Sequence, residues 1–368
     1  MPLVNAKCTN CGGTLQVDAA KEAAVCPFCG SAFIVEKAIQ NYNIVNNIQA
    51  NVVNIYGAQQ KDYVIKGGVL TKYKGESVNA VLPDTVHGIG PKAFADCKYL
   101  ESVTFPSSLK SIEEGAFYRC GNLKEISFPQ GLQSIGDCAF AFCNGLQRVK
   151  IPSSVKTVGH CAFLKCDSLT EAVFEEGVQT IGALAFYECP SLKKIVLPKS
   201  LKTVLPLAFY DCPNLTDVYY NGSLPELLCF CAETDRNASD AYEDTLNQVE
   251  KIFRRYPCPE SLQDDSGVFD GYCFDYGEVL SIPSVKNLYT DGKLIEGTFT
   301  FPKECAEKGV RFMHFTLLRG SDKIHTIVLP GNYPHKGKLD TCPICGSYKS
   351  ISLFGKCKKC GTKFIREK

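Results

Sequence analysis

Apolar residues recur through the middle of the chain with a constant step of twenty-three residues. An Ala-Phe pair marks each step, and its phenylalanines are Phe94, Phe117, Phe140, Phe163, Phe186 and Phe209. A cysteine follows three residues later, at Cys97, Cys120, Cys143, Cys166, Cys189 and Cys212. Because a fixed step of this length is typical of stacked structural repeats, the pattern predicts a solenoid in which each repeat forms one coil.

A short alternating segment in each repeat predicts a β-strand. In one copy Leu100 is followed by Val103 and Phe105, and the other copies keep this spacing. A proline usually comes next, as at Pro106, and ends the strand because its φ is fixed and it has no N–H; Glu175 replaces it once. A second apolar position, such as Ile112, is expected to turn the chain into the next coil. Stacked coils then share one core, with strands about 4.8 Å apart.

The pattern L-x-x-L-x-L is that of a leucine-rich repeat. From about Gly67 to Tyr220 the chain resembles the BspA-type class, whose units read close to L-x-x-I-x-I-P-x-x-V-x-x-I-x-x-x-A-F-x-x-C. The predicted fold class is therefore a β-rich leucine-rich repeat solenoid with 23-residue units. The resemblance implies recognition of other macromolecules, and the repeat carries no catalytic motif.

Side chains that alternate with the buried positions of each strand are expected to line an exposed face of the sheet. This candidate partner-binding face comprises Ser102, Thr104, Glu125, Ser127, Arg148, Lys150, Glu171, Val173, Lys194, Val196, Asp217 and Tyr219. Two interpretations remain open, and they are not exclusive. The face binds a ligand, or the alternating charges from Glu125 to Asp217 stabilise neighbouring strands by up to about 1 kcal/mol per pair.

Four C-x-x-C pairs, each followed by glycine, predict two structural zinc sites near the chain ends. Their cysteines are Cys8, Cys11, Cys26, Cys29, Cys342, Cys345, Cys357 and Cys360. With four thiolates around each ion, no coordination position remains for a reactive water. A redox dithiol, the alternative, requires a βαβ pattern that neither end offers. Both ends resemble zinc ribbons of many prokaryotic proteins, which implies a bacterial, cytoplasmic origin.

The whole chain has 21 cysteines, and its formal net charge is +1. The odd count and the two cysteine patterns favour a reducing compartment over a secreted disulfide framework. Cysteines of the repeat are predicted to be inert buried thiols, with disulfides or metal binding as the alternatives. Neither a targeting segment nor a membrane span is evident, so no membrane partner and a cytoplasmic location are expected.

The solenoid is thus expected to be flanked by small zinc ribbons and a small α+β or β-rich domain. The predicted domains are a zinc ribbon (1–37), an Asn-rich linker (38–62), the solenoid (63–224), an uncharacterised β-rich domain with a leading helix (225–335) and a second ribbon (336–368). Within the linker, residues 41–56 combine β-branched residues with low charge, which suggests self-association or an extended linker. In the fourth domain, helical spacing covers 233–256. Strands are expected at 267–282, 293–301, 310–318 and 323–329.

The leading functional hypothesis is a non-catalytic scaffold that binds a protein partner. Weak nucleic-acid binding through the ribbons is a second hypothesis, since lysines and Arg366 gather at the C-terminus. A third is an enzyme with its site in residues 258–325. That region contains Cys258, Cys273, Cys305, His314 and His325, but no recognisable catalytic motif.

Overall fold

The structure is a computed structural model. It describes residues 3–7, 14–18, 23–25, 32–34, 62–230, 242–257, 260, 263, 285–308, 323–330, 342, 344 and 355–366. They fall into two compact units, Met1–Val64 with Tyr73–Gly75, and Ile65–Lys72 with Glu76–Lys368. In the first unit, β1 (Leu3–Lys7) pairs antiparallel with β2 (Thr14–Asp18), and β3 (Ala23–Val25) pairs antiparallel with β4 (Ala32–Ile34).

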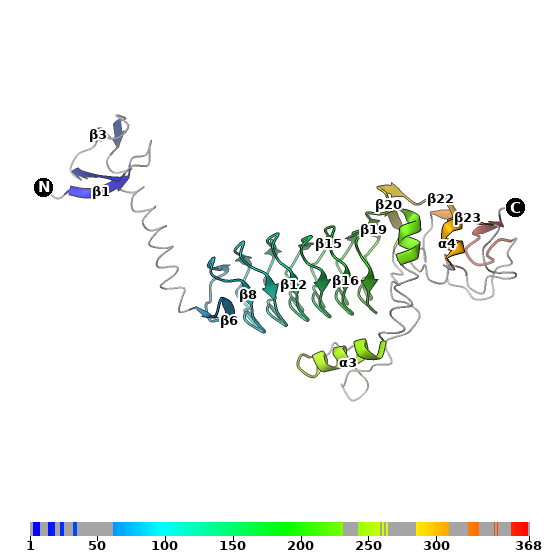
Figure 1. Ribbon diagram of the computed structural model, residues 1–368, viewed down its shortest axis with the longest axis horizontal. Coiled ribbons are helices and arrows are strands. Elements are labelled where there is room, and N and C mark those ends of the chain that lie inside the picture. Colours follow the sequence, from blue (N-terminus) through cyan, green and yellow to red (C-terminus); the bar gives the residue numbers. More distant parts are fainter. Residues whose placement is uncertain are drawn as a thin grey trace. The chain divides into compact units, whose positions relative to one another are not determined.

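The predicted strands of the repeat form the front of a solenoid, whose coils stack side by side (Figure 1). A three-stranded sheet contains β7 (Asn79–Val81), β9 (Ser102–Thr104) and β11 (Glu125–Ile126). A six-stranded sheet follows. Its order is β13 (Arg148–Ile151), β15 (Glu171–Phe174), β17 (Lys194–Leu197), β19 (Asp217–Tyr220), β20 (Asn287–Thr290) and β21 (Lys293–Leu294). All neighbours are parallel except the β20–β21 hairpin.

A second sheet runs along another side of the coils, at the positions that the sequence indicated only as turns. It comprises β5 (Tyr63–Lys66), β6 (Val69–Tyr73), β8 (Gly88–Ile89), β10 (Ser111–Ile112), β12 (Ser134–Ile135), β14 (Thr157–Val158), β16 (Thr180–Ile181) and β18 (Thr203–Val204). These strands are short, but backbone hydrogen bonds connect each coil to the preceding one. For example, the Gly136 N–H donates to the Ile112 carbonyl oxygen over 2.8 Å. At Gly159 a side chain has no room, since an added Cβ would lie 2.5 Å from the Gly136 carbonyl carbon.

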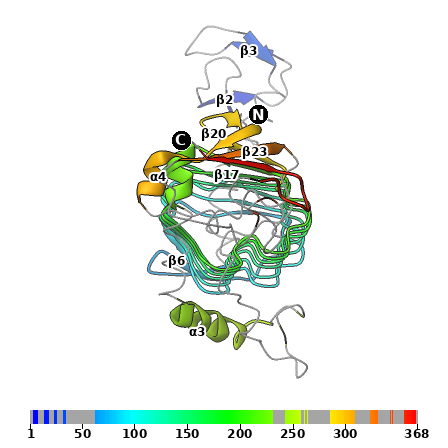
Figure 2. The ribbon, with the colours of Figure 1, turned by 90° about the vertical axis from the view of Figure 1, so that its right-hand side faces the viewer.

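The Ala-Phe position builds the centre of the core. Adjacent phenylalanine rings from Phe94 to Phe209 stack with centroids 4.7 to 5.3 Å apart, and Figure 2 shows the coils superposed along this direction. Phe94, Phe117, Phe140, Phe163 and Phe186 are completely buried. Because each ring stacks on the next along the column, the column ties each coil to the next.

The repeat cysteines are free thiols, and all except the half-buried Cys97 are buried. The Sγ atoms of Cys120, Cys143, Cys166, Cys189 and Cys212 each lie 3.1 to 3.3 Å from the carbonyl oxygen of a phenylalanine in the preceding coil. Each thiol thus fills a small apolar position and donates a weak hydrogen bond. Burial raises the pKa of the Cys166 thiol well above its usual range, in agreement with the inert role predicted for it.

Helix α3 (Tyr242–Phe253) packs on the turns of the solenoid. Val249, Ile252 and Tyr256 are buried in one cluster with side chains of successive coils, among them Tyr118 and Leu184. Two polar contacts strengthen the docking: Arg255 forms an ion pair with Glu114 at 2.9 Å, and the Lys92 ammonium lies 4.4 Å from the centre of the Tyr256 ring. The helix predicted at 233–256 is confirmed over 242–253, and residues 233–241 lie outside the described part.

The C-terminal elements are a helical segment (224–230), α4 (Lys303–Glu307), β22 (Gly297–Thr300), β23 (Ile324–Leu329) and β24 (Lys363–Arg366). Strands β22, β23 and β24 form a parallel sheet. The strand predicted at 323–329 is confirmed as β23, whereas 293–301 divides into β21 and β22. The strands predicted at 267–282 and 310–318 lie outside the described residues.

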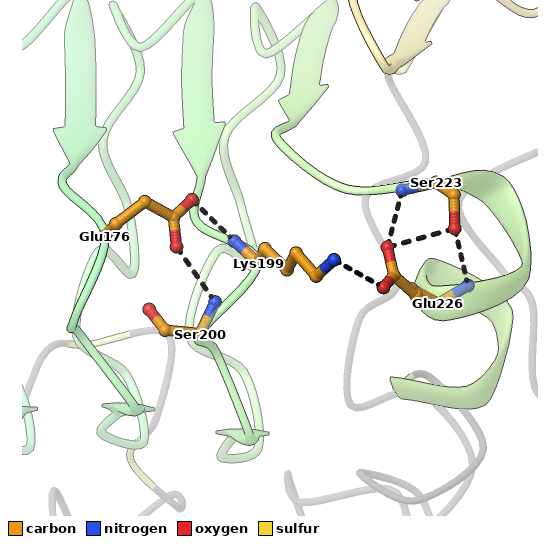
Figure 3. Close-up of polar contacts among 5 residues, drawn as sticks. All are labelled: Glu176, Lys199, Ser200, Ser223 and Glu226. Atoms are coloured by element: carbon orange, nitrogen blue, oxygen red, sulfur yellow. Dashed lines mark hydrogen bonds and ion pairs between the residues drawn. The ribbon is translucent and has the colours of Figure 1, made fainter.

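A polar cluster joins the last coils to segment 224–230 (Figure 3). Ser223 and Glu226 form a reciprocal cap, in which the Ser223 N–H donates to the Glu226 carboxylate over 2.8 Å and the Glu226 N–H donates to Ser223 Oγ over 3.5 Å. Lys199 pairs with the same carboxylate at 2.7 Å, and its own backbone N–H donates to Glu176 over 2.9 Å. The cluster therefore fixes the start of the helical segment against the solenoid.

Replacing Glu226 by glutamine is expected to reduce the loss of stability in acid. The hydrogen bond from Lys199 lowers the pKa of Glu226 to about 2, below the ordinary value of 4.5. Because this pKa is depressed in the folded state, the ionised carboxylate contributes stability above pH 4.5 that disappears as the pH falls towards about 2. Thermal unfolding followed across this interval should show a shallower pH dependence for Glu226→Gln than for the wild type. Glu76→Gln, at an exposed glutamate, should leave the slope unchanged.

Candidate binding face and metal centre

The predicted face residues share one surface of the front sheets because burial alternates along each strand. In β13, Val149 and Ile151 are buried while Arg148 and Lys150 are exposed. The same alternation holds in β15, β17 and β19. Exposed members of the face are Thr104, Glu125, Ser127, Arg148 and Lys150; half-buried members are Ser102, Glu171, Val173, Lys194, Val196, Asp217 and Tyr219. All twelve therefore point away from the core, and the face is most open over the first coils.

One row of this face is polar, and part of it forms a structural charge ladder. Strand pairing places Glu171 beside Lys194 and Lys194 beside Asp217. Lys194 forms an ion pair with Glu171 at 2.8 Å, and Asn287 Nδ2 donates to the Asp217 carboxylate over 2.8 Å. With side chains about a quarter to two-fifths exposed, an ion pair of this kind is worth below about 1 kcal/mol. The structural interpretation therefore fits the last coils.

The neighbouring row changes from charged to apolar along the stack. Register pairs Lys150 with Val173, and Val196 with Tyr219. Tyr219 in turn stacks on Tyr289 of β20, with ring centroids 4.2 Å apart and planes inclined by 2°. Tyr289 was not predicted, because strand β20 lies seventy residues beyond β19 and outside the repeat register. Its only local signal is the alternation in Asn287-Leu288-Tyr289-Thr290.

The front face is hollowed where the two front sheets meet. A depression of about 410 Å³ is lined by Ser102, Val103, Lys124, Glu125, Ile126, Ser127, Gln147 and Arg148. Strand β11 is only two residues long and belongs to a different sheet from β13, so the ladder is interrupted here. Lys124 pairs with Glu101 at 2.8 Å. Within the described part of the chain, neither Glu125 nor Arg148 forms an ion pair, which leaves both charges available at the rim.

Three of the four predicted C-terminal ligands converge on one point. The Sγ atoms of Cys342, Cys357 and Cys360 all lie within 4.8 Å of one another, and those of Cys342 and Cys360 are 3.7 Å apart. Gly361 has a φ of 79°, and its N–H donates to the Cys357 carbonyl over 2.9 Å. The glycine thus permits the tight turn that brings two thiols to one side, and the cluster suits a thiophilic metal. The fourth ligand, Cys345, lies outside the described residues.

The N-terminal ligands Cys8, Cys11, Cys26 and Cys29 also lie outside the described residues. The first pair falls between β1 and β2 in the sequence, and the second pair falls between β3 and β4. Each predicted knuckle therefore falls in the connection between two antiparallel strands. Residues 41–56, the segment predicted to self-associate or to form an extended linker, also lie outside the described part.

The described residues include only part of the regions on which the two alternative functions depend. Of the cysteines and histidines considered for catalysis, Cys305 is buried in α4 and His325 is exposed on β23. Cys258, Cys273 and His314 lie outside the described residues. Near the C-terminus, Lys356, Lys358, Lys359 and Lys363 are exposed, which leaves nucleic-acid binding as a prediction. Among the described helices, none has the length and apolar character needed to cross a bilayer.

Comparison with solved structures finds other leucine-rich repeat proteins. The T. pallidum leucine rich repeat protein is 32% identical over 43% of this chain and 78% of its own, with a TM-score of 0.41. One from Eubacterium ventriosum is 28% identical, over 42% of this chain and 45% of its own, with a TM-score of 0.39. One from Bacteroides ovatus is 23% identical, over 59% of this chain and 51% of its own, with a TM-score of 0.38. This chain therefore covers about half the length of the Eubacterium ventriosum and Bacteroides ovatus proteins.

No curated protein matches this chain. The model of the BspA type leucine rich repeat region, by contrast, matches six copies within residues 72–175. This segment carries four of the six stacked phenylalanines, Phe94 to Phe163, and the strands of the interrupted front face. Residues 72–175 belong to the BspA type leucine rich repeat family.

Proposed function

We propose that the protein is a non-catalytic scaffold that holds a protein partner on the front face of its solenoid, around the depression between β11 and β13. The observation that supports this function most directly is a pair of charges at the rim that form no ion pair among the described residues. Glu125 and Arg148 are exposed, of opposite sign, and unused by the charge ladder that stabilises the later coils. If the face had only a structural role, we would expect Glu125 and Arg148 to form an ion pair, as Lys194 and Glu171 do.

The chemistry of the face indicates the kind of partner. Ser102, Ser127 and Gln147 supply hydrogen-bonding groups inside the depression, while Lys124, Glu125 and Arg148 supply both signs of charge. The apolar row at Val173, Val196 and Tyr219 extends the surface over the next three coils. Protein interfaces combine such features, with aromatic and arginine anchors beside a polar rim. The expected partner therefore presents a complementary polar surface with both charges.

Reversing the charge of Arg148 tests this proposal. Tagged full-length wild type, Arg148→Glu and Lys202→Glu are used as baits in extracts of the source organism, and captured proteins are quantified by mass spectrometry. Lys202 is an exposed residue just before β18, so Lys202→Glu makes the same charge change away from the front face. A partner recovered by wild type and Lys202→Glu, but at least about tenfold less by Arg148→Glu, is the expected result.

Two outcomes would contradict the proposal. Equal recovery of the partner by Arg148→Glu would remove the depression from the binding site. A wild-type bait that captures nothing beyond an unrelated solenoid bait would remove the binding function itself. Circular dichroism of the three proteins establishes that the variants are folded, which an exposed charge reversal should allow.

The cysteine clusters are proposed to hold two structural zinc ions, one at each end of the chain. All-cysteine sites close the coordination sphere, so the ions would stabilise small modules rather than activate water. Thiolate ligands and the free buried thiols of the repeat suit a reducing compartment, and we place the protein in the cytoplasm.

A further inference from the structure

A second pair of thiols lies apart from the metal cluster, at the C-terminal end of the solenoid. Cys229 belongs to the helical segment 224–230, and Cys305 belongs to α4, seventy-six residues later. Their Sγ atoms are 3.8 Å apart. Figure 2 shows α4 beside this helical segment. We propose that Cys229 and Cys305 are a redox-responsive pair that closes to a disulfide when the thiol-disulfide balance becomes oxidising.

The two sulfurs of this pair come from elements outside the repeat, unlike the thiols that stack from coil to coil. Five repeat cysteines, at the positions from Cys120 to Cys212, donate to a phenylalanine carbonyl oxygen of the preceding coil. The Sγ atoms of Cys229 and Cys305 lie within 3.8 Å of each other, and Cys305 Sγ is 3.5 Å from the Pro225 carbonyl oxygen. Since a disulfide bond is about 2.0 Å long, closure requires the sulfurs to approach by under 2 Å. Side-chain rotation within two short helices can supply such a displacement.

Accessibility decides the order of the chemical steps. Cys229 is half-buried, whereas Cys305 is completely buried, and burial raises the pKa of the Cys305 thiol to about 12. The Cys229 thiolate therefore attacks a small disulfide such as oxidised glutathione first, forming a mixed disulfide and releasing one glutathione thiolate. The Cys305 sulfur, having lost its proton to solvent, then attacks the Cys229 sulfur and releases the second glutathione. Two protein thiols are oxidised while one glutathione disulfide is reduced to two thiols.

The proposed bond would tie together elements that are far apart in sequence. The loop that it closes contains α3, which packs on the solenoid turns, and β20, which extends the front sheet beside Tyr219. Segment 224–230 is already held to the solenoid by Lys199, which forms an ion pair with Glu226 at 2.7 Å. Oxidation would thus fasten α4 to the end of the solenoid and restrict opening of the intervening elements.

The test uses the zinc-loaded full-length chain, equilibrated in mixtures of reduced and oxidised glutathione and then alkylated. Digestion without reduction, followed by mass spectrometry, should recover a peptide pair linked through Cys229 and Cys305. Thermal unfolding should show a midpoint about 5 °C or more higher for the oxidised than for the reduced protein, since a long loop is closed. Cys229→Ser and Cys305→Ser should each abolish both the linked peptide and the shift.

Cys97→Ser is the matched control, because Cys97 is a half-buried cysteine that lies outside the pair. This variant should keep the linked peptide and the shift. Recovery of Cys229 only as a stable mixed disulfide with glutathione would overturn the proposal, as would linkage of Cys305 to a different cysteine. Zinc content is measured in every sample, so a loss of metal thiolates cannot be mistaken for oxidation of this pair.

Discussion

Phe140→Ala is expected to destabilise the solenoid by about 3 to 5 kcal/mol. Phe140 is completely buried, and its ring stacks between Phe117 and Phe163 at centroid distances of 4.9 and 5.3 Å. It also meets the edge of Phe128 at 5.6 Å. Alanine would remove all of these contacts and leave a cavity that the parallel coils cannot fill, because their spacing is set by two hydrogen-bonded sheets. A loss of this size is comparable with the whole stability of many domains.

Urea unfolding followed by far-ultraviolet circular dichroism measures this effect, since the chain has no tryptophan to report by fluorescence. Tyr99→Ala is the control, because it also removes an aromatic ring from the repeat region. The Tyr99 side chain is 63% exposed, and its loss should change stability by less than about 0.5 kcal/mol. Equal losses from the two variants would show that the phenylalanine column does not hold the coils together.

The front of the solenoid could be predicted because one coil repeats the same local pattern. Strands β13, β17 and β19 fall where the alternation indicated them, and β13 and β17 each end before a proline, Pro152 and Pro198. The strand pattern of a single coil is a weak signal, but the same pattern occurs in six coils. The second sheet was missed for a physical reason. Strands such as β10 and β12 have two residues, too few for an alternation, and hydrogen bonds between coils define them.

The contacts that cover the turns and the end of the solenoid join residues that are far apart in the sequence. Helical periodicity predicted α3, but nothing local shows that Ile252 packs near Leu184. In the same way, β20 adds to the sheet through pairing of Asn287 with Asp217 across a long connection. The depression also required the structure, because it arises from the mismatch between β11 and β13 rather than from a motif. The C-terminal cysteine cluster was predictable because C-x-x-C spacing is itself a local geometric signal.

Removing metal is expected to have the largest effect on the C-terminal sheet. Structural zinc contributes on the order of 10 kcal/mol to the folding of small cysteine modules. Here Cys357 and Cys360 precede β24, which pairs with β23 through Val328 and Ile365. If zinc holds the turn that contains Cys357 and Cys360, a chelator should separate β24 from β23 and expose that edge of β23. Hydrogen exchange should then accelerate in 324–329 and 363–366, while β15 and β17 of the solenoid remain protected.

Native mass spectrometry measures how many zinc ions each variant binds. The wild type should carry two zinc ions and Cys360→Ser one, since this substitution removes a ligand from the C-terminal site alone. Cys97→Ser, which alters a half-buried cysteine of the repeat, should keep both ions. Retention of two ions by Cys360→Ser would exclude Cys360 from the coordination sphere. Fast exchange of 363–366 in the metal-loaded wild type would argue that the ion does not hold β24 in place, because a strand fastened by a closed four-sulfur site should open rarely.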